Sequence, residues 1–117
     1  MLLERKEAIR ESDGLTIVES YFDSSNIAKV NYIPVKNYMF IFFNNGLVYS
    51  YSNITEELYK KFEDSESQGK FFITEIKKKP KEFKYLREFK LYEFEKQDIA
   101  EIIKTLKEGK LDENQNI

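Results

Sequence analysis

The chain has 117 residues, a length typical of one domain, and a formal net charge of −2. Hydrophobic residues make up 41% of it and aromatic residues 15%, which is too apolar for a disordered chain and favours strands. Cysteine and histidine are both absent, which excludes disulfides, thiolate nucleophiles, zinc sites built on Cys or His, and histidine acid–base catalysis. We therefore expect a non-enzymatic protein that needs no cofactor and no metal.

The N-terminus becomes charged within its first residues and has no apolar stretch typical of a signal peptide. The longest apolar run, residues 38–43, has the length of a strand and is far shorter than the roughly 18 residues of a membrane span. A cytoplasmic protein without a membrane partner is the expectation.

The first half of the chain predicts an antiparallel sheet. Residues 1–14 are highly charged and are expected to form an arm or a short helix that ends near Gly14. Residues 15–22 read as a strand. Three further strands follow over residues 27–33, 38–43 and 47–52, and the turn residues Asn44-Asn45-Gly46 join the last two. These three strands predict a β-meander.

The second half predicts helices around one more strand. Thr55 can cap a helix over residues 55–64, and Ser67 a shorter one that Pro80 stops. Residues 83–94 resemble a long strand. Apolar residues at helical spacing then predict an amphipathic helix over residues 97–107, which either packs on the sheet or forms a homodimer contact.

The predicted fold class is therefore α+β: an antiparallel β-meander sheet with helices packed on one face, plus a C-terminal strand and an amphipathic helix. We expect a charged arm over residues 1–14, one domain over residues 15–109 and a disordered tail over residues 110–117.

Several short motifs between residues 24 and 77 carry a resemblance to a known family. In chain order they are Ser24-Ser25-Asn26-Ile27, Tyr32, Phe42-Phe43-Asn44-Asn45-Gly46, Tyr49-Ser50-Tyr51, Ile54, Tyr59, Phe62, Ser67-Gln68-Gly69-Lys70-Phe71-Phe72 and Ile76-Lys77. In this order they resemble the KTSC domain, a module named after the C-terminus of some lysyl-tRNA synthetases. The Tyr-x-Tyr pair after the Asn-Gly turn is the most specific part of this resemblance.

The resemblance implies the fold of this module and suggests RNA binding as its activity. The family usually ends this region with an Ile-Arg sequence, whereas residues 77–80 here are three lysines and a proline. Residues 83–108 lie outside the resemblance.

Tyr49 and Tyr51 are candidates for stacking on nucleic-acid bases. They lie two residues apart on a strand, so both rings project from one sheet face, as in modules that bind single-stranded RNA or DNA. The alternative is that both rings pack in the core under the helix at residues 55–64.

A basic segment follows. Residues 70–90 hold eight basic and three acidic residues, a net charge of +5. Alternating cations and rings could hold phosphates and bases, or could belong to a solvated edge strand whose lysines prevent strand pairing. The candidate nucleic-acid contacts in it are Lys77, Lys78, Lys79, Lys81, Lys84, Arg87 and Phe83.

The segment Ser67, Gly69 and Lys70 is a candidate anion site, since amides at a helix start can bind an anion. The full spacing of a phosphate-binding loop is absent.

Three function classes stay open: a module that binds RNA or single-stranded DNA, a small phage- or bacteria-encoded module that binds a host protein, and a binder of a small ligand or anion. The last predicts a concave pocket beside Gly69.

Overall fold

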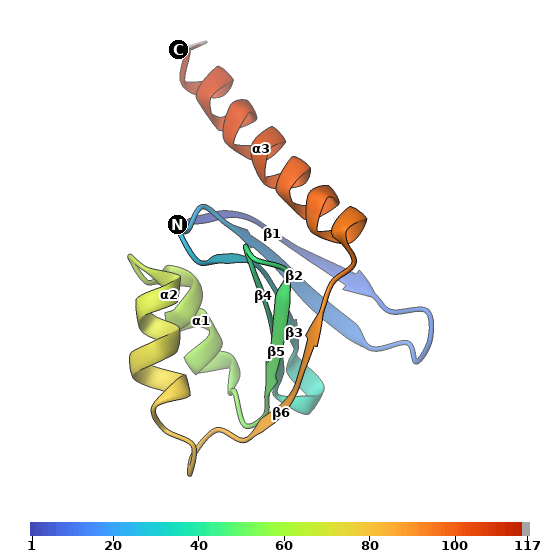
Figure 1. The fold of residues 1–117 in the computed structure, drawn as a ribbon, viewed down its shortest axis with the longest axis vertical. Helices are drawn as coiled ribbons and strands as arrows, with labels where there is room; N and C mark the ends of the chain where they lie inside the picture. Colours follow the sequence, from blue (N-terminus) through green and yellow to red (C-terminus); the bar gives the residue numbers. More distant parts are fainter. Residues whose placement is uncertain (116–117) are drawn as a thin grey trace.

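The computed structural model describes the backbone of residues 1–115 and the side chains of residues 1–109. Six antiparallel strands form one sheet in the order in which they occur in the chain, as the meander predicted. Helices α1 and α2 cover one face of this sheet (Figure 1). The strands are β1 (Leu2–Ile9), β2 (Thr16–Phe22), β3 (Ile27–Ile33), β4 (Tyr38–Phe43), β5 (Leu47–Tyr51) and β6 (Tyr85–Lys90).

The charged N-terminal segment is an edge strand, so the expectation of an arm or a short helix was wrong. Residues of β1 pair along most of β2, from Leu2 opposite Phe22 to Ile9 opposite Thr16. Its charged residues lack the apolar alternation by which a strand is predicted, because an edge strand is solvated and needs little such alternation.

The helical elements follow the expected order, with shifted ends. They are η1 (Pro34–Lys36), α1 (Glu56–Asp64), α2 (Gln68–Phe71), the π-helix η2 (Phe72–Lys77) and α3 (Glu93–Gln115). The last strand is shorter than predicted, and α3 begins at Glu93 rather than at residue 97. The tail predicted over residues 110–117 is helical as far as Gln115, and residues 116–117 lie outside the described part of the chain.

Local chemistry explains several of these ends. The Thr55 hydroxyl accepts a hydrogen bond from the amide of Leu58 and starts α1. Ser67 caps α2 through the amide of Lys70. Gly46 has a φ of 91°, a conformation that the tight turn between β4 and β5 requires and that glycine adopts without strain.

The core lies between the inner sheet face and the helices α1, α2 and η2. Alternate residues of β2, β3 and β4 point to this face, and Phe62, Phe72 and Ile76 close it from the helical side. The rings of Tyr32 and Tyr59 stack at 4.4 Å between their centroids, at the junction of sheet and α1.

A buried polar chain links α1 to the sheet. The Tyr59 hydroxyl donates to Ser20 Oγ at 2.7 Å, and Ser20 Oγ donates to Glu63 Oε2 at 2.5 Å. Arg5 of β1 lies 3.4 Å from the same carboxylate oxygen. Ser20, Tyr59 and Glu63 are all buried, so each group depends on the next for its hydrogen bond.

The outer sheet face is aromatic and cationic. Every cation–π pair found among the described residues lies on it, for example Lys29 Nζ at 5.3 Å from the rings of both Tyr21 and Phe42. Burial lowers the pKa of Lys29. Helix α3 contacts β1 and β3, and its residues Ile99, Ile103 and Leu106 are half-buried, so the helix packs on the sheet only in part.

None of the helices in the described part of the chain is long and apolar enough to cross a membrane.

Removing the central hydroxyl of the polar chain should destabilise the fold. Ser20→Ala leaves the Tyr59 hydroxyl and the Glu63 carboxylate without this partner, and we expect a loss of about 1–3 kcal/mol in the free energy of unfolding. Urea denaturation measures it. Ser12→Ala, in the exposed turn after β1, is the control and should stay close to wild type. Equal stability of the two variants would contradict a structural role for the chain.

Tyr32 should make stability fall at alkaline pH. Burial raises its pKa to about 12, with Glu56 adding to the effect, from about 10 in an unfolded chain. A raised folded-state pKa means that the neutral phenol stabilises the fold. This contribution is complete below pH 10 and is lost as the pH rises through 12. The free energy of unfolding, measured by urea denaturation at several pH values across this range, should decrease less steeply with pH for Tyr32→Phe than for wild type. An equal decrease in both proteins would contradict this role of Tyr32.

Candidate functional site

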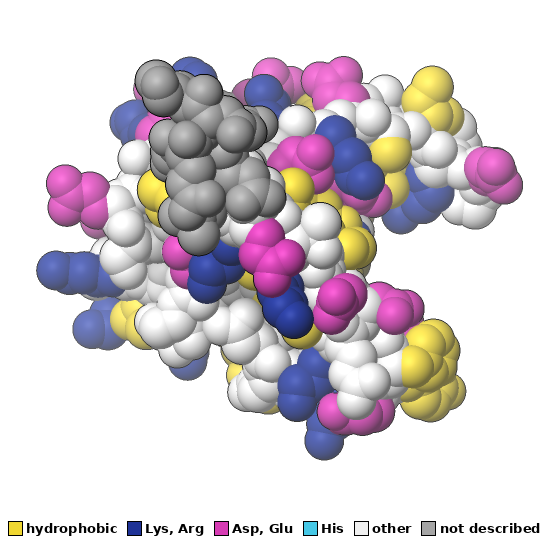
Figure 2. Space-filling model, turned by 90° about the horizontal axis from the view of Figure 1, so that it is seen from above, with side chains coloured by type: hydrophobic (Ala, Val, Ile, Leu, Met, Phe, Trp, Pro, Cys, Tyr) yellow, Lys and Arg dark blue, Asp and Glu magenta, His cyan; other side chains and the backbone are white. Residues whose placement is uncertain are grey.

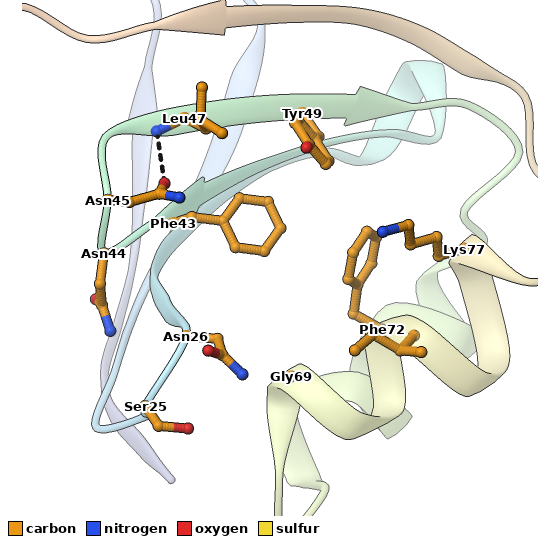
Figure 3. A pocket seen from close by; sticks show the side chains of 11 residues that line it. Ser25, Asn26, Phe43, Asn44, Asn45, Leu47, Tyr49, Gly69, Phe72 and Lys77 are labelled. Carbon is orange, nitrogen blue, oxygen red and sulfur yellow. Dashed lines mark hydrogen bonds between the residues drawn. The ribbon is translucent and has the colours of Figure 1, made fainter.

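A pocket of about 350 Å³ opens between the ends of the central strands and the η2 helix, and we call it the motif pocket. Figure 3 shows side chains from the sheet and from the helical side pointing toward one another across it. It is lined by Ser25, Asn26, Phe43, Asn44, Asn45, Leu47, Tyr49, Gly69, Phe72, Ile73 and Lys77.

Two loops form the polar side of the motif pocket and are tied to each other. The amide of Asn44 donates to the carbonyl of Asn26 at 2.8 Å, and Asn44 Nδ2 donates to the carbonyl of Ser24 at 3.0 Å. In the turn, Asn45 Oδ1 accepts from the amide of Leu47 at 3.0 Å. These bonds fix the loop before β3 against the turn after β4, so this side of the pocket is preformed.

Part of the amide chemistry of these loops remains available to a ligand. Because Asn45 Oδ1 is engaged, its Nδ2 group is left as a donor, while the engaged Nδ2 of Asn44 leaves Oδ1 as an acceptor. Within the described residues, the side-chain amide of Asn26 has no hydrogen-bond partner. The pocket therefore presents both donors and acceptors.

Aromatic rings form the apolar wall. Phe43 lies 5.0 Å from Tyr49 and 5.7 Å from Phe72 between ring centroids, in edge-to-face geometry in both cases. Burial, with a smaller contribution from Glu88, raises the pKa of Tyr49. The phenol therefore stays neutral at physiological pH and can donate or accept a hydrogen bond.

Gly69 sets the width of the pocket. A Cβ atom at this position would lie 3.0 Å from Asn26 Nδ2, closer than ordinary van der Waals contact. The absence of a side chain thus lets the helical side approach the loop before β3.

The structure separates the predicted stacking residues. Tyr51 is only 6% exposed and packs on Phe72 in the core, so for this residue the packing alternative holds. Tyr49 lies on the same covered face but lines the motif pocket. Phe83 is half-buried against the core.

The predicted basic residues are divided between two surfaces. Lys77, at the end of η2, lines the motif pocket, and Arg87 lies on the outer sheet face beside Phe89. Lys79 is paired with Glu75 at 3.0 Å. The remaining predicted lysines, Lys78, Lys81 and Lys84, are exposed on the segment that follows Lys77.

The predicted anion site is not formed as expected. The amide of Lys70 donates to Ser67 Oγ at 3.2 Å and the amide of Phe71 to the Ser67 carbonyl at 3.0 Å, so both are already used. Of Ser67, Gly69 and Lys70, only Gly69 lines the motif pocket, and the pocket lies beside it as the small-ligand hypothesis required.

Sequence reasoning did not assign the loop residues Ser25, Asn26, Asn44 and Asn45 to a site. The signal for them was present, because nine of the eleven lining residues belong to the motifs that carried the resemblance, all except Leu47 and Ile73.

The fold and the pocket define a small α+β domain, an antiparallel meander with one helical layer and a preformed pocket between the two. The family model of the KTSC domain matches residues 23–79, so this part of the chain is a KTSC domain. All eleven pocket residues fall within the match. Among curated proteins, no match to the chain is found.

Gly69→Ala should narrow the motif pocket without unfolding the domain. The new methyl group must displace the Asn26 side chain, which is flexible, so the free energy of unfolding should change by less than about 1 kcal/mol. The side-chain amide signals of Asn26 in an NMR spectrum should shift. Gly109→Ala, with no atom within 4 Å of the new Cβ, is the control and should leave them in place. Unshifted Asn26 signals in Gly69→Ala would contradict the contact.

Proposed function

We propose that the protein is a non-catalytic module that binds single-stranded nucleic acid, with one unstacked base in the motif pocket and the adjoining phosphates on the basic loop. The basic loop comprises Lys77, Lys78, Lys81 and Lys84. The observation that carries the proposal is that the motif pocket and the basic loop adjoin each other, because Lys77 belongs to both.

The chemistry of the pocket suits a nucleobase. Its volume is at the lower end of the range of about 300–1,000 Å³ that is usual for ligand sites, which suits one ring system. Phe43, Tyr49 and Phe72 offer ring faces and edges for stacking, and the asparagine amides offer donors and acceptors for the edge of a base.

The basic loop suits the phosphates. Lys77, Lys78 and Lys81 are exposed, and none of them has an ion-pair partner among the described residues. Cations at the mouth of an aromatic pocket are the usual arrangement for single-strand binding. By contrast, the surface in Figure 2 shows acidic and basic side chains interspersed, which gives it no continuous positive field.

A second candidate function uses the same pocket alone. The pocket beside Gly69 and the free amides of its loops would also hold a small planar ligand with an acidic group near Lys77. Such a ligand needs no contact with the rest of the basic loop, and this difference separates the two functions.

Binding should be measured by fluorescence anisotropy with labelled single-stranded RNA, single-stranded DNA and duplex across a salt series. We expect affinity for single strands that decreases with salt, with a slope of about 0.7 per phosphate contact in a plot of log K against log salt. Lys77→Glu/Lys78→Glu should weaken binding by about tenfold or more. Lys60→Glu/Lys61→Glu on α1 makes the same charge change away from the site and should bind like wild type.

A pocket variant tests base entry separately. Ile73→Trp places a large side chain at the rim from an exposed position, and Val35→Trp is the matched exposed control. Loss of binding in the first variant alone supports insertion of a base. No binding at low salt overturns the proposal, and equal binding by both variants overturns base entry. Mononucleotides that bind as tightly as oligonucleotides, without salt dependence, would favour the small-ligand function.

A further inference from the structure

Strand β6 has an unpaired edge. It pairs with β5 on one side, and no other described strand lies on its far side. All six of its residues are exposed. Six of the ten large hydrophobic side chains that are exposed in the described part of the chain fall between residues 85 and 102: Tyr85, Leu86, Phe89, Tyr92, Phe94 and Ile102.

The rest of the fold leaves this edge accessible. After β6 the chain turns into α3, which leads away from the β6 edge and contacts β1 and β3 (Figure 1). The opposite edge of the sheet, β1, is protected by the run of charges Glu4-Arg5-Lys6-Glu7. An exposed strand edge offers unpaired N–H and C=O groups that another strand can satisfy.

We infer that a second copy of this chain occupies the edge, with the two β6 strands antiparallel and the two sheets joined into one. Two identical antiparallel strands in a continuous sheet are related by a twofold axis perpendicular to that sheet. The outer faces of the two copies then lie on the same side of the joined sheet. A residue on the outer face of one copy therefore stands opposite an outer-face residue of the other copy, and the same holds for the inner face.

This symmetry leaves few registers. An axis at Arg87 sets Arg87 opposite its own copy, and an axis at Glu88 does the same for Glu88, so both place like charges together. An axis at Leu86 falls on the irregularity of β6, where the pairing with β5 shifts between Ser50 and Tyr51. A bulge disrupts a regular ladder, so this register is unfavourable.

An axis at Phe89 is free of these conflicts. It places Glu88 of each copy opposite Lys90 of the other on the inner face, which gives two complementary charge pairs. The two Phe89 rings then adjoin each other on the outer face, where Phe89 is 37% exposed in the single chain. The ladder extends over residues 87–91, which lie beyond the bulge. Because the two β6 edges pair with each other, no further copy can add at this edge and the assembly closes as a dimer.

The full chain should be analysed by sedimentation velocity and by size-exclusion chromatography with light scattering, from micromolar to submillimolar concentration. We expect a reversible dimer. Lys90→Glu and Glu88→Lys each set like charges opposite each other twice, and each should raise the dimer dissociation constant by about tenfold. The double variant Glu88→Lys/Lys90→Glu restores opposite charges and should recover dimerisation. Lys104→Glu on α3 is the control for a change in net charge.

Circular dichroism and thermal denaturation confirm that each variant is folded. Rescue in the double variant, with Lys104→Glu like wild type, supports the pairing and its register. A monomer at all concentrations overturns the inference. A dimer that none of the β6 variants weakens also overturns it, because the interface then lies elsewhere. Weakening by both single variants without rescue overturns the Phe89 register.

Discussion

The attachment of α1 to the sheet is the interaction on which the inner face depends. Tyr59 provides both parts of it, because its ring stacks on Tyr32 and its hydroxyl reaches Ser20 inside the core. The Tyr32 hydroxyl in turn donates to the carbonyl of Ile54 at 2.7 Å, which fixes the chain just before α1 begins. Once α1 is placed, the short link to α2 fixes η2, and η2 supplies the helical wall of the motif pocket.

Most of the sheet could be predicted because its signals are local. Apolar residues that alternate in β3 and β5, a continuous apolar run in β4 and a glycine at the turn specify these three strands without any knowledge of the rest of the chain. Strand β1 could not be predicted in this way. Its charged residues satisfy local patterns for an arm or a helix as well as for a strand, and only pairing with β2 decides between them.

The site was predictable in composition but not in arrangement. The motifs of the family contain most of the pocket residues, yet their order in the sequence does not show that the loop before β3 meets the turn after β4. The fates of Tyr49 and Tyr51 illustrate the same limit. Their spacing shows that they share a face, while the position of η2 decides that Tyr51 is sealed against Phe72 and Tyr49 borders a pocket.

The flanking segments and the pocket meet at the loop between β2 and β3. The N-terminal amine donates to the carbonyl of Asp23 and to Gln68 Oε1, both at 2.8 Å, and Lys107 of α3 lies 3.3 Å from the Asp23 carboxylate. Three residues further on, Asn26 lines the motif pocket and limits the space at Gly69. Gln68, the neighbour of Gly69, is itself buried and donates to the carbonyl of Ser65 at 2.9 Å. The segments outside the KTSC match are therefore attached to the loop before β3 and to the start of α2, the two elements that meet at Gly69.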